Sequence, residues 1–516
     1  MESVTRAGPR ADDGKGWKNV KKYDLWINGQ YCQSQGGQYF EVRNPANGEL
    51  IAEVARANEA DVDQAIKAAE AAFKNSDWAK NRELRYHTLN RLAALIRENM
   101  PELMALESEI TGRPIREMKA QLGRLPDWYE FFASVTNTLS DEAHPFNGPY
   151  VNYTERLPLG VVALVTPWNH PLMILTKKLA PALAAGNAVV IKPSEDAPVT
   201  PTLLAALTKQ AGVPDGIVNL INGFGYDVGK YLTTRPVFAK IDLTGGTETG
   251  RHVAAAAGQN LSKVAAELGG KASLLVLPDA DIQEAVNGAA FASFIATGQT
   301  CIQGSRILVH SSKYREFVDA LVAKAKGLRV GNPRELATDI GPVISKKQYD
   351  RILSYIKIGV EEGAKVAFGG RALTDGAYAK GYFIEPTIFV DVRNDMRICQ
   401  EEIFGPVTCV LKYDTVEELI ATANATEMGL AMAVWSNDIR LAHRIASQLE
   451  AGIVYINDYH RATPISPWGG FKNSGIGSEN SIQCYKDYTK IRSVIVNYNA
   501  DKFDWFDGSA QVKRYT

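Results

Sequence analysis

Between residues 160 and 458 the chain repeats one pattern, in which short apolar runs alternate with longer stretches of helical character. The first four runs, at 160–169, 188–195, 217–223 and 239–246, each end in a turn. Short continuous apolar runs are typical of strands buried on both faces, and strands separated by helices usually pair in parallel. The alternation therefore predicts an α/β fold built on a parallel sheet.

A second set of apolar runs follows and predicts a second α/β domain, in keeping with the two or three domains expected for 516 residues. These runs lie at 272–277, 305–309, 387–392, 407–413 and 452–458.

The flanking regions are also patterned. Residues 22–43 alternate around Asn28-Gly29, as in a β-hairpin, and 58–99 has helical spacing. The β-prone run at 491–498 either closes a sheet of its own chain or serves as an edge that pairs with a neighbouring subunit.

The charge balance favours a small-molecule partner. Lysine plus arginine number 57 and aspartate plus glutamate 58, so no global field attracts nucleic acid or an anionic membrane. No apolar stretch reaches the length of a membrane span. Residues 1–23 carry acids without an apolar core, unlike a secretory or transit signal, so a cytoplasmic protein is expected.

The five cysteines form no CxxC pair and no cluster with histidines, so we expect no metal site and a reducing compartment. Cys301 stands out because small and polar residues precede it. Such a cysteine can present a thiolate, the nucleophilic form of the side chain. Isolated cysteines are more often buried apolar residues, so Cys301 alone leaves a structural role open.

Two further polar residues stand out by the residues around them. Glu267 lies just before Gly269 and Gly270, where a backbone without side chains can approach a substrate and present a general base. Asn169 ends the first apolar run, and its amide can donate to a developing oxyanion. Each also has an ordinary alternative, a solvated glutamate and a turn-forming asparagine.

Other strand ends suit a nucleotide. Lys192 and Glu195 could bind ribose hydroxyls, and the glycine-rich turns at 223–229 and 245–250 open onto helical sequence, as a pyrophosphate site requires. The glycine spacing in 223–229 departs from G-x-G-x-x-G by one residue, so that turn alone does not establish a dinucleotide site.

Taken together and in order, these strings resemble the aldehyde dehydrogenase superfamily from about Tyr23 to Asn497. The matching strings lie at 167–169, 192–195, 245–250, 267–271, 298–301, 401–406 and 467–475.

The resemblance implies a particular division of the chain and a homodimer or homotetramer. A Rossmann-type NAD-binding domain would comprise 24–139 and 159–269, a second α/β catalytic domain 270–470, and a small β oligomerisation element 140–158 with 485–500.

The resemblance also implies the reaction. Cys301 would add to an aldehyde to form a thiohemiacetal, whose oxyanion would be held by the Asn169 amide and the Cys301 backbone N–H. After hydride passes to the cofactor, Glu267 would activate water to hydrolyse the thioester.

NAD is the implied cofactor, because the Glu195 carboxylate would bond both ribose hydroxyls and repel a 2′-phosphate. Glu402 and Phe404 would lie at the nicotinamide ribose, and Gly246 stands where many relatives have serine. The expected cofactor contacts are Thr166, Pro167, Trp168, Lys192, Ser194, Glu195, Gly225, Gly229, Thr244, Gly245, Gly246, Glu267, Leu268, Gly269, Glu402 and Phe404.

Substrate selectivity is predicted from four residues. Lys177 stands where many relatives carry tryptophan, and we expect it at the catalytic centre; Arg124 and Arg461 add further positive charge. These cations would suit a carboxylate-bearing semialdehyde, unless they are ordinary surface charges. The aromatic residues would instead suit an aromatic or apolar aldehyde, with amino-aldehydes a further possibility; they are Trp128, Tyr129, Tyr459 and Trp468.

Two other classes stay open at this point. One is an acylating dehydrogenase that passes the acyl group to coenzyme A, against which the presence of Glu267 argues, because by resemblance that branch lacks the hydrolytic base. The other is a non-catalytic binding protein on the same fold.

Overall fold

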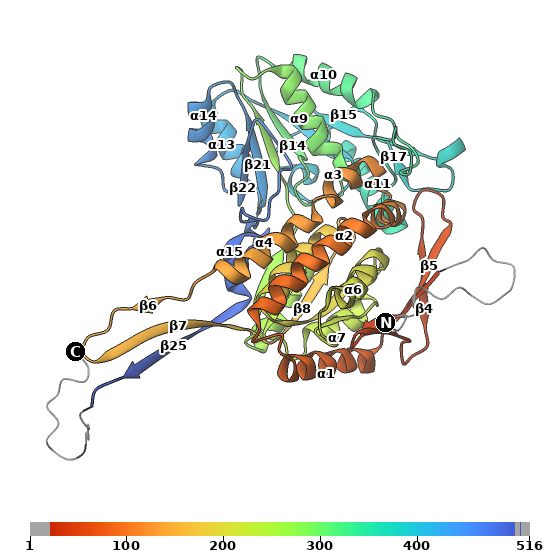
Figure 1. Cartoon of the computed structure of the whole chain (residues 1–516). Coiled ribbons are helices and arrows are strands. Elements are labelled where there is room, and N and C mark those ends of the chain that lie inside the picture. Colours follow the sequence, from red (N-terminus) through yellow and green to blue (C-terminus); the bar gives the residue numbers. More distant parts are fainter. Residues whose placement is uncertain (1–20, 501–505, 507–516) are drawn as a thin grey trace, which may run out of the picture.

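The computed structural model describes residues 21–500 and 506, and the predicted mixed α/β fold is confirmed. Two large sheets lie in separate halves, and a long β-arm projects from one of them (Figure 1). Most of the N-terminal stretch for which no targeting signal is expected, residues 1–20, lies outside the described residues. No helix within the described ranges is long and apolar enough to cross a membrane.

The first large sheet has eight strands in the order β24-β12-β11-β8-β9-β10-β2-β3, with five parallel strands at its centre. The central strands are β8 (Val161–Thr166), β9 (Ala188–Pro193), β10 (Val218–Leu220), β11 (Lys240–Thr244) and β12 (Lys263–Glu267). The antiparallel edge strands are β2 (Leu25–Ile27), β3 (Gln30–Cys32) and β24 (Gly475–Ile476). The four strands predicted from the first apolar runs are therefore neighbours in one sheet.

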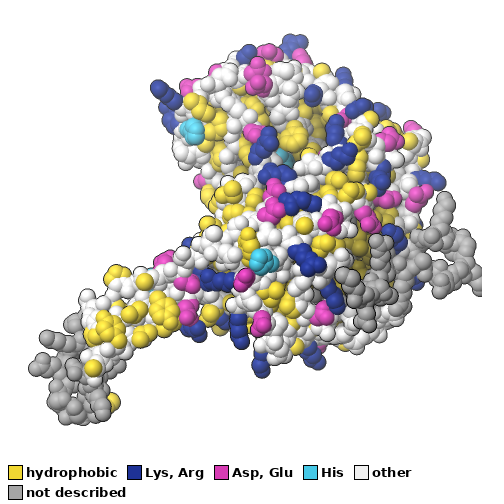
Figure 2. Space-filling model, in the orientation of Figure 1, with side chains coloured by type: hydrophobic (Ala, Val, Ile, Leu, Met, Phe, Trp, Pro, Cys, Tyr) yellow, Lys and Arg dark blue, Asp and Glu magenta, His cyan; other side chains and the backbone are white. Residues whose placement is uncertain are grey.

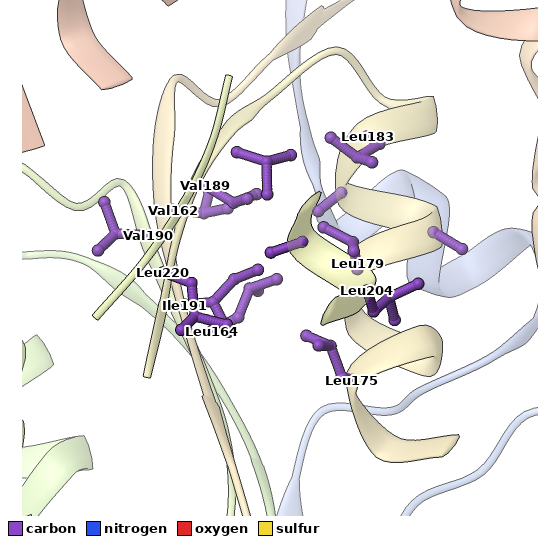
Figure 3. Packing of buried hydrophobic residues seen from close by; sticks show 14 of the residues in the cluster. Val162, Leu164, Leu175, Leu179, Leu183, Val189, Val190, Ile191, Leu204 and Leu220 are labelled. Atoms are coloured by element: carbon purple, nitrogen blue, oxygen red, sulfur yellow. The ribbon is translucent and has the colours of Figure 1, made fainter. Parts of the chain in front are cut away.

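The helix α5 (Pro171–Ala184) is buried along its whole length because it packs directly on this sheet. Figure 3 shows Leu175, Leu179 and Leu183, spaced four residues apart, turned toward the side chains of β8 and β9. Burying a leucine fully contributes roughly 1.5–3 kcal/mol. This layer fixes the positions of the strand ends that carry the candidate site.

The other helices of this half are α1 (Glu59–Asn75), α2 (Arg82–Thr111), α3 (Ile115–Leu122), α4 (Leu125–Thr138), α6 (Val199–Ala211), α7 (Lys230–Thr233) and α8 (Thr247–Gln259), with a π-helical turn η1 (Gly225–Gly229) before α7. The helical character predicted over 58–99 is confirmed, and it belongs to two helices, α1 and α2. It divides at Ser76, where the backbone is extended, and α2 restarts at its N-cap Asn81. The turn-forming run Asn75-Ser76-Asp77 gives the physical reason.

The predicted hairpin is correct only around Asn28-Gly29, where both residues have positive φ, 53° and 73°, as a tight turn requires. Residues beyond it join a separate three-stranded sheet, because β4 pairs with β5 rather than with the hairpin. That sheet comprises β1 (Lys21–Tyr23), β4 (Tyr39–Arg43) and β5 (Leu50–Ala55).

The second large sheet has seven strands in the order β15-β18-β19-β14-β13-β21-β22, and all but β15 are parallel. They are β13 (Ser273–Val276), β14 (Arg306–His310), β15 (Lys365–Phe368), β18 (Thr387–Val390), β19 (Val407–Tyr413), β21 (Ala431–Trp435) and β22 (Ile453–Ile456). All five runs predicted for this half are strands of this sheet.

Its helices are α9 (Ile282–Phe294), α10 (Tyr314–Lys326), α11 (Lys346–Glu361), α12 (Arg397–Gln400), α13 (Val416–Asn424) and α14 (Ile439–Ala446). Short elements complete this half: η2 (Ile295–Gly298), η3 (Gly376–Tyr378), and the pairs β16 (Ala372–Leu373) with β17 (Phe383–Ile384) and β20 (Met428–Gly429) with β23 (Phe471–Lys472).

The arm is a three-stranded antiparallel sheet in which β25 (Thr489–Asn497) pairs with β7 (Tyr150–Pro158), and β7 with β6 (Ala143–His144). The last predicted strand thus closes a sheet of its own chain. Its outer edge pairs with no other strand among the described residues, and apolar side chains lie exposed along the arm (Figure 2), including Val151, Ile491 and Ile495. The helix α15 (Ser481–Asp487) leads into it. Pairing with a second subunit stays a prediction.

Candidate active site

A cavity of about 390 Å³ is lined by residues from both halves of the molecule. It brings together Cys301 and Glu267 with all four predicted substrate residues, Arg124, Lys177, Arg461 and Trp468. They come from separate parts of the sequence between Arg124 and Trp468, and the fold makes them neighbours.

Cys301 is positioned by a strained backbone turn. Ala296, Thr297 and Gly298 have φ values of 53°, 56° and 69°, all in the left-handed region. A Cβ at Gly298 would lie 2.1 Å from the Gly405 carbonyl oxygen, so the turn cannot accept a side chain there. Non-glycine residues with positive φ are uncommon, and their clustering at one turn is typical of functional sites.

The thiol of Cys301 is partly accessible within the cavity, but it is not a ready thiolate. Burial raises its pKa to about 12, with Glu267 raising it further and the Lys177 ammonium lowering it. The thiolate suggested by the sequence is therefore not the resting form near neutral pH, because the surroundings are too apolar. A base must remove the proton before the sulfur can attack.

Glu267, the last residue of β12, is a candidate for that base. Its side chain is buried, and neither carboxylate oxygen has a hydrogen-bond partner among the described residues. Burial raises its pKa well above the usual value, Glu479 raises it further, and Lys177 and Lys178 oppose the rise. An unpartnered buried carboxyl in a cavity is a common arrangement for a general base.

The two glycines after Glu267 are required by close packing. A Cβ on Gly269 would lie 2.5 Å from a carboxylate oxygen of Glu402, and a Cβ on Gly270 would lie 2.3 Å from the carbonyl oxygen of Cys301. These glycines let the end of β12 reach the cysteine turn and Glu402 at once. The predicted approach of this backbone to a substrate stays a prediction.

Asn169 is buried at the end of β8, where its amide Nδ2 donates to the Gln299 carbonyl at 3.1 Å. The amide is thus fixed against the turn that carries Cys301. It holds a second hydrogen that this bond does not use.

Lys177 lies inside the cavity, with Nζ 3.2 Å from Glu479 Oε2 and 3.9 Å from the centre of the Trp468 ring. The neighbouring Lys178 is more deeply buried and bonds both Glu479, at 2.8 Å, and Asp242. Burial opposes the charge on Lys178, and the two carboxylates raise its pKa beyond the usual value. Lys177 is the member of the pair that faces the cavity.

Glu479 and Asp242 are absent from the sequence-based site. A signal for them exists, because two adjacent lysines inside an otherwise apolar helix require buried acids as partners. Which acids supply the charge is decided only by the fold.

Arg124 and Arg461 lie at the cavity's exposed rim, and each is already paired. Arg124 Nε is 3.2 Å from Asp127 and its Nη1 donates to the Ala462 carbonyl at 3.1 Å. Arg461 Nε is 2.9 Å from Asp458. The expected cations are therefore in place, but neighbouring acids offset much of their charge.

Aromatic and histidine side chains form much of the wall. His460 is uncharged near neutral pH because burial lowers its pKa to about 3, and burial likewise lowers the pKa of His170. The Tyr459 hydroxyl donates to the Ile302 carbonyl at 2.6 Å, and Trp128 donates to Asn480 at 2.8 Å. Arg113 and Glu117, a buried ion pair at 3.4 Å, also line the cavity. Neither this pair nor the two histidines were expected in the site, because none of them belongs to a recognisable motif.

The predicted cofactor residues collect at one edge of the eight-stranded sheet, because they follow the carboxyl ends of adjacent parallel strands. Each group lies at or just after the end of one strand: Thr166, Pro167 and Trp168 for β8; Lys192, Ser194 and Glu195 for β9; Gly225 and Gly229 for β10; Thr244, Gly245 and Gly246 for β11; and Leu268 and Gly269 for β12.

This edge has features that fit a dinucleotide. The Thr166 hydroxyl is buried and has no hydrogen-bond partner in the part of the chain that the structure describes. Gly246 is the N-cap of α8 without a side-chain cap, and a Cβ on Gly225 or Gly246 would meet nothing within 4 Å. Open space before free helical N–H groups is what a pyrophosphate requires. Only the second glycine-rich turn leads into a long helix, because α7 after Gly229 is a single turn.

Glu402 and Phe404 reach this edge from the other half. Glu402 accepts the Gly270 N–H at 2.9 Å, and burial raises its pKa to about 7. The Phe404 ring contacts Trp168 edge-on at 5.2 Å. At β9, Lys192 Nζ is 3.5 Å from the Glu195 carboxylate. Thr244 was expected only as a cofactor contact, but it also lines the cavity, where its hydroxyl donates to Glu479 at 3.4 Å.

Comparisons with known proteins agree with this geometry. The sequence pattern of the aldehyde dehydrogenase family matches residues 31–494. An NAD⁺ complex of aldehyde dehydrogenase from Bacillus cereus is similar at a TM-score of 0.91 with 40% identity, covering 93% of this chain and 97% of that one. Betaine aldehyde dehydrogenase from Staphylococcus aureus in complex with NAD⁺ has a TM-score of 0.92 and 36% identity, covering 94% and 96%. The chain belongs to the aldehyde dehydrogenase family.

Proposed function

We propose that this enzyme oxidises an aldehyde to a carboxylic acid with NAD and water, through a covalent intermediate on Cys301. The observation that carries the proposal is the shared cavity of the Cys301 thiol and the unpartnered Glu267 carboxyl, beside the edge formed by the strand ends. A nucleophile and a base in one water-restricted cavity suit acyl chemistry.

In the first half of the reaction, Glu267 takes the Cys301 proton, directly or through a water, and Sγ attacks the carbonyl carbon. The new carbon–sulfur bond leaves negative charge on the former carbonyl oxygen, to which the free Asn169 amide hydrogen and the Cys301 backbone N–H donate. A dinucleotide held at the strand-end edge would supply the acceptor for the hydride that leaves this carbon.

In the second half, Glu267 first releases the Cys301 proton to solvent and then takes a proton from water, which attacks the thioester carbon. The carbon–sulfur bond breaks, the acid is released, and Sγ leaves as a thiolate that takes the proton back from Glu267 to restore the thiol. The Lys177 ammonium in the same cavity favours each negative charge that forms there. Because Glu267 is present, water rather than coenzyme A is the proposed acyl acceptor; a product assay with coenzyme A distinguishes the two.

For the cofactor, we propose that Glu195 binds the adenosine ribose hydroxyls and Glu402 the nicotinamide ribose, with the pyrophosphate at Gly245 and Gly246. The fit of this edge to a dinucleotide supports NAD. Residues 24–139 with 159–269 would form the cofactor domain and 270–470 the catalytic domain. The arm, within 140–158 and 485–500, would join subunits of a homodimer or homotetramer.

For the substrate, we propose an aldehyde with an apolar body and a distal carboxylate. Aromatic walls suit the body, while Arg124 and Arg461 at the rim can turn from their acids toward a substrate carboxylate. The Staphylococcus aureus relative is a betaine aldehyde dehydrogenase, but the Lys177 ammonium disfavours a cationic aldehyde here. The aromatic wall makes a neutral aromatic aldehyde the second candidate.

The test is an aldehyde panel with the purified enzyme, NAD and detection of NADH. It should contain a semialdehyde, a neutral aldehyde of equal length, an aromatic aldehyde and an amino-aldehyde. NADH production with a preference for the semialdehyde is expected. Absence of NADH with every aldehyde, together with a Cys301 that resists alkylation, would instead favour a non-catalytic protein.

A further inference from the structure

A second cavity, of about 270 Å³, lies at the base of the arm. It is formed where the start of α2, the end of β7 and the start of β25 meet. Four of its lining residues carry positive charge, Lys80, Arg82, Arg85 and Arg156, and none is an aspartate or glutamate. A cavity lined by one sign of charge concentrates the opposite sign of ion.

The buried member of this group is Arg85, whose residue is only 3% exposed. Its guanidinium donates from Nε to the Ala184 carbonyl at 2.9 Å and from Nη1 to the Trp78 carbonyl at 2.5 Å. It forms no ion pair within the described residues, and burial lowers its pKa to about 10. A buried guanidinium bonded to neutral carbonyls still lacks a counter-charge, which is costly.

Two of the other three cations also lack an ion-pair partner among the described residues. Arg156 Nη1 makes a long contact with the Thr489 hydroxyl, 3.4 Å, and neither Arg156 nor Lys80 forms an ion pair inside the described ranges. Only Arg82 is paired, with Asp141 at 3.3 Å. Among the described residues, Asp141 is therefore the one acid that forms an ion pair with any of the four cations.

We propose that this cavity is a binding site for a phosphate-bearing small molecule. Guanidinium groups bind phosphate oxygens through two parallel hydrogen bonds, and the Tyr485 hydroxyl in the cavity wall can supply another donor. The cavity is wider than a single phosphate needs, which favours a phosphate ester over the free ion.

The site would also join two parts of the fold. Arg85 belongs to α2 in the body, and Arg156 belongs to β7 in the arm. A shared phosphate would bridge them, so its binding should stabilise the arm against the body. This inference does not depend on the aldehyde reaction.

The test measures binding of inorganic phosphate and of glycerol 3-phosphate to the full-length enzyme by calorimetry and by thermal unfolding. Ionic strength is held constant with sodium chloride, and saturating NAD fills the cofactor edge. We expect saturable binding and a rise in Tm of roughly 1–3 °C. Tighter binding of glycerol 3-phosphate identifies an ester as the ligand; equal affinities identify the free ion.

The decisive variant is Lys80→Ala with Arg156→Ala, which removes two unpaired cations and leaves the carbonyl contacts of Arg85 intact. Its phosphate affinity should fall at least about tenfold, with aldehyde oxidation unchanged. The matched control, Lys67→Ala with Arg91→Ala, removes the same charge from exposed helix surfaces and should bind as the wild type.

Equal phosphate binding in all three proteins, or none in the wild type, would overturn the proposal. If the double variant does not fold, phosphate affinity is measured for the single variant Arg156→Gln, which should bind phosphate at least about threefold more weakly than the wild type. Hydrogen exchange on the wild type adds an independent readout: phosphate should slow exchange near Lys80–Arg85 and residues 156–158, and unchanged exchange there counts against the site.

Discussion

The floor of the substrate cavity and its rim differ in how their charges are satisfied. At the floor, Glu267 has no hydrogen-bond partner among the described residues, and Cys301 is a thiol held protonated by burial. At the rim, Arg124 and Arg461 are exposed and each has an acid beside it. In the proposed mechanism, reactivity would therefore depend on groups without polar partners, and selectivity on groups that must exchange one partner for another, at a modest gain.

The most severe disruption of the floor is Cys301→Ser. We expect turnover to fall by about 10⁴-fold or more, because the serine hydroxyl is much less acidic than the thiol and therefore a much weaker nucleophile at this position. NAD binding, followed by fluorescence titration, should be unchanged. Near-normal NADH production by this variant would remove Cys301 from the mechanism.

Glu267→Gln should lower steady-state turnover by about 10²–10⁴-fold, since an amide cannot take a proton from water. Acyl-enzyme should accumulate and be detectable by mass spectrometry after quenching. Glu70→Gln, a change of an exposed glutamate on α1, is the matched control and should behave as the wild type. Full activity of the Glu267 variant would mean that another group is the base.

The raised pKa of Glu267 gives activity and stability opposite dependences on pH. Its ionised form is the base, so kcat/KM should rise as pH rises through the folded-state pKa. Folding favours its neutral form. Glu267 therefore makes its full contribution to the stability of the fold at pH values below its unfolded-state pKa, and this contribution declines as pH rises through the folded-state pKa. Rate profiles and Tm series for wild type and Glu267→Gln check this; a Tm difference independent of pH contradicts it.

Gly270→Ala tests whether the floor depends on backbone packing. The added methyl would lie 2.3 Å from the Cys301 carbonyl oxygen, so the cysteine turn or the end of β12 must shift. Overpacking costs roughly 1–3 kcal/mol, and a displaced turn should lower kcat about tenfold or more. Gly258→Ala, at an open helical position, should leave kcat unaltered and should not lower Tm.

The rim should respond least. Arg124→Ala or Arg461→Ala should lower kcat/KM for a carboxylate-bearing semialdehyde by about 3–10-fold, while a neutral aldehyde of equal length is unaffected. The exposed Arg315 provides a control substitution to alanine. Equal losses for both aldehydes would show that the arginines shape the rim without binding a carboxylate.

The sequence predicts the floor better than its electrostatic surroundings, and distance along the chain explains why. Glu267 with Gly269 and Gly270, and likewise Cys301, belong to short sequence strings whose chemistry can be inferred from the residue types alone. Glu479, by contrast, bonds Lys178 across 301 residues, and no local pattern pairs them. The pKa values of the floor depend on such long-range partners, so they could not be predicted.

The same reasoning applies to the fold. The parallel strands were predictable because continuous apolar runs are typical of sheets covered on both faces. The partner of β25 was not, since β7 lies over 300 residues earlier and an exposed strand has no burial pattern to identify its neighbour. Likewise, Arg124 lines the cavity, but its contact with the Ala462 carbonyl depends on a distant loop.

The rim loop between β22 and Trp468 has anchors in both halves. One end continues from the seven-stranded sheet, and the other is fixed by pairing of Trp468 with Glu479 and of β24 with β12. Within it, Asn457 and His460 adopt positive φ, 52° and 62°. Such a span can change length or composition during divergence without moving the nucleophile, so new aldehyde preferences can evolve here while the reaction itself is preserved.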